Sequence, residues 1–331
     1  MSIGGSDLPL VNPATVAKSP AGGAHLGVPA GGRVRRLTGI DRLVVVVMVL
    51  IPLMLTTIFV ILPAIASVVL SFSSWDGIGG IGKIKWVGFQ NYVNIFTIDP
   101  SFWPAIQHNL LWLVVLFFIA TPFGMFMAVL LDKEIRGNRI YQTPMFLPVV
   151  LSLALIGFIW QLQYSRDFGL INAILQTVGL QNKDNPVDWY GDPNIAIWAV
   201  LAASAWKHAG YIMLLYLAGL KGVDPSLREA AAVDGASEIK TFFRIVFPVM
   251  RPINIIVVVI TVIESLRAFD LVWIVNKGRN GLELISTLVT SNVTGEASRV
   301  GYGSALATIM LVISLVFIAL YLRAVFTEEE R

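Results

Sequence analysis

The chain has no cysteine and is poor in both charge and histidine. The absence of cysteine from all 331 residues excludes disulfides, thiolate metal sites and cysteine nucleophiles. Only 14% of the residues are charged, whereas a soluble domain carries about 25%. The three histidines, His25, His108 and His208, are far apart and lack the spacing of metal ligands. The net charge of +3 is spread over several loops, so we expect no nucleic-acid partner.

What the chain does have is long apolar runs. Hydrophobic residues make up 56% of the sequence, and the mean hydropathy is +0.75. A run of about 20 apolar residues crosses a bilayer as a helix, and backbone groups in lipid must hydrogen-bond within such helices. The sequence therefore predicts an all-α membrane protein with six transmembrane helices, at residues 43–70, 109–131, 141–164, 194–220, 253–275 and 302–322.

Basic residues between these runs predict the orientation. They concentrate before the first span, in the turn at residues 132–140 and in the loop at residues 221–252. Because such residues favour the cytoplasmic side, we expect both termini and these two segments to be cytoplasmic. Residues 1–40, rich in Gly, Ala, Pro and Ser, are expected to be a disordered cytoplasmic tail, ahead of a membrane domain at 41–323 and a C-terminal cytoplasmic tail at 324–331. The charged turn that begins at Asp132 is expected to be solvated.

The loop before the fifth span has helix signals of its own. Asp224 followed by proline is typical of a helix start, and residues 227–233 favour helix. Gly235 is a natural stop, Ser237 can cap a second helix, and Pro248 follows that helix. The sequence thus predicts two short helices that meet at a bend. An amphipathic helix resting on lipid headgroups is the simpler alternative.

The residues of this loop resemble a known motif. Glu229-Ala230-Ala231, then Asp234-Gly235-Ala236, then Ile245 and Pro248 closely resemble the EAA motif of ABC importer permeases. In that family the loop inserts into a cleft of the ATPase subunit and transmits its closure. The resemblance implies a type I importer permease (MetI-like) fold with a cytoplasmic EAA coupling loop at residues 224–252. The coupling residues it implies are Glu229, Ala230, Ala231, Asp234, Gly235, Ala236, Arg244, Ile245 and Pro248.

Further segments are similar to those of sugar permeases. Residues 87–92 are similar to the "GLxNY" segment of that group, and Trp206-Lys207 and Phe269-Asp270 also match it. The chain is thus identified as a member of the maltose-type (MalF-like) carbohydrate permeases, within which it is most similar to α-glucoside permeases.

This resemblance implies an importer of several subunits in a bacterial cell membrane. The expected partners are a second, MalG-like permease, an ABC ATPase dimer, an extracytoplasmic solute-binding protein and an oligosaccharide or other sugar. ATP and Mg²⁺ are expected on the ATPase, while this chain is expected to bind no cofactor or metal and to catalyse no reaction.

Polar residues within the fourth and fifth spans are candidate solute contacts. Ser204, His208 and Tyr211 share one stripe of the fourth span, and Glu264 and Arg267 are three residues apart on the fifth. The resemblance implies that these positions line the sugar path. Two structural alternatives stay open: an ion pair between Glu264 and Arg267, and a packing role for His208.

Two other classes of function are alternatives for such a chain. Charged residues inside membrane helices can couple ions to transport, so a stand-alone secondary transporter would use Glu264, Arg267 or Asp270. Such transporters often contain inverted repeats, and the sequence shows none. A membrane enzyme has no support, because no cluster of histidines and carboxylates lies at a membrane face.

Overall fold

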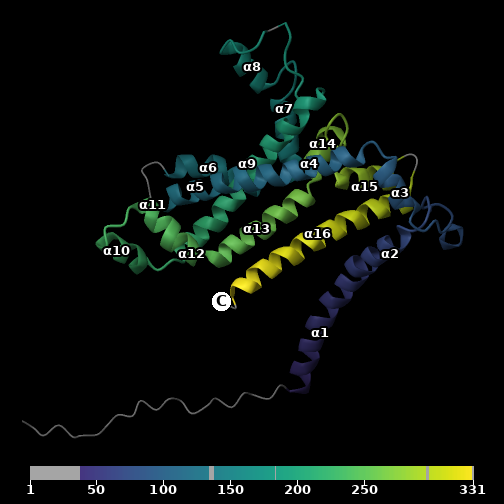
Figure 1. Cartoon of the computed structure of the whole chain (residues 1–331), viewed down its shortest axis with the longest axis horizontal. Helices are drawn as coiled ribbons and strands as arrows, with labels where there is room; N and C mark the ends of the chain where they lie inside the picture. Colours follow the sequence, from purple (N-terminus) through teal and green to yellow (C-terminus); the bar gives the residue numbers. More distant parts are fainter. Residues whose placement is uncertain (1–37, 134–137, 183, 296–297, 330–331) are drawn as a thin grey trace, which may run out of the picture. The chain divides into compact units, whose positions relative to one another are not determined.

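The structure, a computed structural model, describes residues 38–133, 138–182, 184–295 and 298–329. Apart from one isolated bridge between Ser73 and Trp86, these residues form only helices, turns and irregular segments (Figure 1). The fold is therefore helical, as the sequence predicts. The chain divides into two compact units, residues 1–57 and 58–331.

The helices have the following bounds. In the first unit lies α1 (Gly39–Thr56). The second unit contains α2 (Leu62–Leu70), α3 (Gln90–Thr97), α4 (Phe102–Val115), α5 (Thr121–Asp132), α6 (Asn138–Val150), α7 (Leu153–Gln163), α8 (Leu170–Thr177), α9 (Pro193–Lys221), α10 (Pro225–Val233), α11 (Glu238–Thr241), α12 (Phe247–Val249), α13 (Arg251–Leu266), α14 (Asp270–Asn276), α15 (Ile285–Thr294) and α16 (Val300–Glu329). Three π-helical turns join consecutive helices, at Thr57–Ile61, Leu116–Ala120 and Phe242–Val246.

The first helix has the character of a lipid-facing segment. Its start is fixed by a capping box in which Thr38 and Asp41 bond each other's backbone amides. None of its residues is buried, although its sequence is almost wholly apolar. A helix that is apolar all round requires an apolar environment on every side.

Length and composition identify three clear membrane spans among the described residues. These are Gly39–Leu70, Phe102–Asp132 and Val300–Tyr321. A fourth arises if Glu238–Val249 and Arg251–Asn276, which meet at 78°, are counted as one bent span. The helix α9 has 29 residues, which is about 44 Å at 1.5 Å per residue, but it is too polar to meet the same criterion. The predicted number of six spans therefore stays a prediction.

Two of the predicted spans are broken rather than continuous. Residues 141–164 divide into α6 and α7, because Ser152 adopts an extended backbone and its hydroxyl accepts from Leu155 N to start α7. Residues 253–275 divide where α13 ends before Arg267, and Phe269 (φ −149°) precedes α14. The prediction of one uninterrupted helix was wrong in both places.

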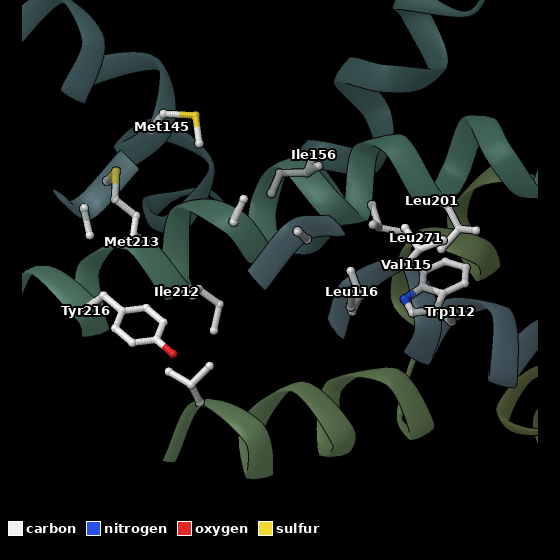
Figure 2. Packing of buried hydrophobic residues seen from close by; sticks show 14 of the residues in the cluster. Trp112, Val115, Leu116, Met145, Ile156, Leu201, Ile212, Met213, Tyr216 and Leu271 are labelled. Atoms are coloured by element: carbon white, nitrogen blue, oxygen red, sulfur yellow. The ribbon is translucent and has the colours of Figure 1, made fainter. Parts of the chain in front are cut away.

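The core of the second unit is built around α9. Figure 2 shows Ile212, Met213 and Tyr216 of α9 among buried residues of the neighbouring helices, including Trp112 and Leu116. Small residues let the helix backbones approach closely: a Cβ added to Gly124 of α5 would lie 2.5 Å from Ala209 O of α9. Gly210 of α9 meets the carbonyl of Met145 of α6 in the same way. The helices α5, α6 and α9 thus form one tightly packed group.

Candidate functional site

The segment at residues 224–249, here called the elbow, has the predicted shape. Asp224 accepts from Ser226 N (2.9 Å) at the start of α10, and this bond lowers the pKa of Asp224. After α10, Gly235 adopts φ +71°, and Ala236 N donates to Ala231 O (3.0 Å) to close the helix end. Ser237 then caps α11. Two short helices therefore meet at a glycine bend, which confirms this prediction.

The motif residues of the elbow lie mostly on its exposed face. Glu229, Ala230, Asp234, Gly235, Arg244 and Pro248 are exposed, Ala236 and Ile245 are half-buried, and Ala231 is buried. Large apolar side chains accompany them: Val233 is 88% exposed, Ile239 74% and Phe243 57%. A contiguous mixture of exposed apolar and charged side chains is typical of a docking surface.

The opposite face of the elbow is fixed to the helix group. Ala231, Val246 and Met250 are buried. Val246 and Met250 belong to the same apolar cluster as the core of α9, and Phe242 and Phe247 pack against it. Asn254 of α13 donates to Phe247 O (2.9 Å). The elbow is therefore anchored on one face and open on the other.

Ion pairs add a second attachment at the end of α5. Arg228 of α10 donates to Asp132 Oδ2 (2.8 Å), and Lys221 Nζ lies 3.3 Å from Asp132 Oδ1. The side chain of Asp132 is only 9% exposed, so the expectation that it is merely solvated was wrong. The adjacent Lys133 pairs with Glu238 of α11, and this pair lowers the pKa of Glu238. No local pattern of residues indicates these contacts, because Arg228 lies 96 residues from Asp132.

The candidate solute contacts on α9 are not equivalent. His208 is buried, with Nε2 3.0 Å from Thr261 Oγ1 of α13 and 3.4 Å from Thr121 Oγ1 of α5. The two threonine hydroxyls are 3.3 Å apart. His208 thus forms a polar node that joins three helices. Ser204 is half-buried and Tyr211 is 37% exposed, so a solute could touch Tyr211 without displacing the core.

The candidates on α13 lie at its end. Glu264 is half-buried, and Arg267 is exposed directly after the last helical residue. The ion pairs found among the described residues do not join Glu264 to Arg267. Arg267 instead lines a hollow of about 580 Å³ together with Phe269, Asp270 and Ser286. An open hollow with a cation, a carboxylate, a hydroxyl and an aromatic ring has the groups that bind a polar solute.

Comparison with known proteins settles the family. Residues 120–327 match the family described as binding-protein-dependent transport system inner membrane component. The chain belongs to this family. It is therefore a permease subunit of an ABC importer and a membrane protein, and a stand-alone ion-coupled transporter is not favoured.

Curated relatives agree with this membership. The chain is 31% identical to a probable ABC transporter permease protein of Pyrococcus horikoshii, over 86% of this chain and 97% of the relative. It is 33% identical to the xylose/arabinose import permease protein XacH of Haloferax volcanii, over 76% and 78%. It is 28% identical to the trehalose/maltose transport system permease protein MalF of Thermococcus litoralis, over 83% and 91%. A MalF-like specificity is thus not singled out among several similar permeases.

A solved structure supports the fold. The permease resembles a chain in the crystal structure of a bacterial ABC transporter involved in the import of the acidic polysaccharide alginate, with a TM-score of 0.74. The two chains are 22% identical, and the match covers 86% of this permease and 96% of that chain. This likeness confirms the helical permease fold and leaves the identity of the solute open.

Proposed function

We propose that this permease imports a carbohydrate and that its elbow is the part that docks on the ATPase. The observation that carries the proposal is the two-sided elbow: its motif residues and Val233 face outward, while Val246 and Met250 hold it to the core. Xylose, arabinose, trehalose and maltose occur in the names of its relatives, which supports a sugar as solute. Within sugars, an α-glucoside is the narrower proposal.

The assembly we propose contains four kinds of partner: a second, MalG-like permease, an ABC ATPase dimer, an extracytoplasmic solute-binding protein and the surrounding bilayer. ATP and Mg²⁺ would bind the ATPase dimer, and its closure would push on the exposed face of the elbow. The excess of basic residues around the elbow supports a cytoplasmic location for this face and for both termini.

The solute path we propose runs past Ser204, Tyr211, Glu264 and Arg267. Tyr211 has exposed ring surface, and aromatic faces pack on sugar rings. Glu264 and Arg267 offer charged hydrogen-bonding groups, which bind hydroxyls more strongly than neutral ones. His208, held by Thr121 and Thr261, would support the path by fixing α9 rather than by touching the solute.

The test is to purify the chain from cells that also express the other subunits of the proposed assembly. We expect an ATPase to co-purify, and we expect uptake into proteoliposomes to require ATP. Calorimetry on the solute-binding protein with xylose, arabinose, trehalose, maltose and alginate oligosaccharides would identify the solute. Uptake driven by an ion gradient in the absence of ATP would overturn the proposal.

A further inference from the structure

Asp132 occupies a position where a carboxylate is ordinarily unfavourable. It is the last residue of α5, and a carboxylate at a helix C-terminus is repelled by the partial negative charge of the helix end. It is also shielded from water, with 9% of its side chain exposed. A nearly buried carboxylate needs strong compensation, so its partners explain why it can stand there.

Both oxygens of this carboxylate are used, and each reaches a different element. Oδ2 accepts from Arg228 Nη1 of α10 at 2.8 Å, while Oδ1 lies 3.3 Å from Lys221 Nζ at the end of α9. The side chain of Lys221 is 57% exposed and that of Arg228 39%. Asp132 is therefore the shared, shielded centre that ties α5, α9 and the elbow together.

The helices joined at this point are packed closely against one another. Gly124 of α5 contacts the backbone of Ala209 of α9, and Thr121 of α5 is within hydrogen-bond distance of His208 of α9 and Thr261 of α13. Packed interiors transmit displacement because they compress little. A push on α10 would therefore reach the candidate solute path on α9 through the end of α5.

We propose that Asp132, with Arg228 and Lys221, forms a clasp that makes the elbow and the α5–α9 pair move together when the ATPase closes. Asp132 is a positioning residue in this proposal, because it acts through Arg228 and touches neither nucleotide nor solute. The inference rests on the proposed function, in which the elbow receives the push. It adds the link between the elbow and the membrane helices.

The absence of cysteine allows a direct test by paired spin labels. Lys240→Cys places one label on α11 and Phe126→Cys the other on α5, at side chains that are both exposed. The distance between the two labels is measured by double electron–electron resonance on the assembled transporter, both nucleotide-free and trapped with Mg-ATP and vanadate. We expect the same narrow distance distribution in both states for the parent protein.

In Asp132→Asn we expect the distribution to broaden and to differ between the two states. Arg228→Gln should broaden the distribution less, because Lys221 still pairs with Asp132. Adding Arg228→Gln to Asp132→Asn should have no further effect, because Asp132→Asn already weakens both pairs. Asp132→Glu, which keeps the charge, should restore a narrow distribution. Glu238→Gln is the matched control. It removes the ion pair with Lys133, whose two side chains are 82% (Glu238) and 45% (Lys133) exposed. Such exposed ion pairs contribute little to stability.

The proposal is overturned if the parent distance changes between states, or if Asp132→Asn leaves both distributions unchanged. Additive effects of Asp132→Asn and Arg228→Gln would also overturn it. If the ATPase fails to co-purify with the parent protein, the proposed function fails instead. The clasp is then judged on the permease alone, where Asp132→Asn must still broaden the distribution.

Discussion

The elbow and the candidate solute path are held in place by different means. In the elbow, short-range devices set the shape: Asp224 and Ser237 cap its helices, and Gly235 makes its bend. On the path, His208 and the threonines it meets are held by contacts between distant helices. The elbow can therefore lose a surface side chain and keep its fold, whereas the path cannot lose a core group without loosening the bundle.

The largest effect is expected at Glu229. Glu229→Ala removes an exposed motif carboxylate from the outward face of the elbow. We expect ATP-driven uptake of the sugar to fall by on the order of tenfold or more, since couplings between sites range up to about 3 kcal/mol. The melting temperature should stay close to that of the parent, because exposed side chains contribute little to stability. Glu238→Ala, another exposed carboxylate of the elbow, is the control and should keep most of the uptake.

A stability loss is expected instead at His208. His208→Ala leaves the hydroxyls of Thr121 and Thr261 without their shared partner inside the core. Thr261 Oγ1 still donates to Val257 O (2.7 Å), so the loss is that of a buried hydrogen bond, about 0.5–1.5 kcal/mol. Thermal unfolding in detergent should therefore begin at a lower temperature. The preference among sugars should not change. A changed preference with unchanged stability would place His208 in contact with the solute.

Tyr211→Ala is the counterpart of that variant on the same helix. Because the side chain is 37% exposed, we expect a smaller loss of stability and an altered rate or preference in sugar uptake. Competition between the cognate sugar and the others of the panel measures this. An identical sugar profile would remove Tyr211 from the path.

Two glycines sharpen the comparison further. An added Cβ at Gly124 would lie 2.5 Å from Ala209 O in the helix core, and overpacking costs about 1–3 kcal/mol. At Gly235 the added atom meets nothing within 4 Å, and only the φ of +71° opposes it, which costs about 1–2 kcal/mol. We expect Gly124→Ala to lower the melting temperature more than Gly235→Ala does. For each degree by which the melting temperature falls, we expect Gly235→Ala to lower sugar uptake more.

The smallest effect is expected from pH at Glu238. The hydrogen bond and the positive charge of Lys133 lower the pKa of this carboxyl below its ordinary value of 4.5. The pair therefore stabilises α11 fully above pH 4.5, and its contribution is lost as the pH falls through the lowered pKa. The amide exchange rate of residues 237–241, divided by the intrinsic rate at the same pH, should rise as the pH falls below 4.5. Glu238→Gln should abolish this rise.

The sequence predicted local features well and long-range ones poorly. The start of α10, the bend at Gly235 and the cap at Ser237 depend on neighbouring residues, so they could be foreseen. The breaks before Ser152 and after Leu266 could not, because apolar residues on both sides of a break look like one continuous run. The role of Asp132 was hidden for another reason: its partners come close only after α5 and α9 pack.

The central claim is that the outward face of the elbow is covered by an ATPase. Val233 is 88% exposed on this face, and Val233→Cys would be the only cysteine of the chain. We predict that it reacts with a maleimide in the permease alone, becomes protected when the ATPase is present, and cross-links to that subunit. The control is Phe168→Cys, at a side chain 93% exposed outside the elbow. It should react equally with and without the ATPase and should not cross-link to it. Equal labelling of Val233→Cys with and without the ATPase would contradict the account.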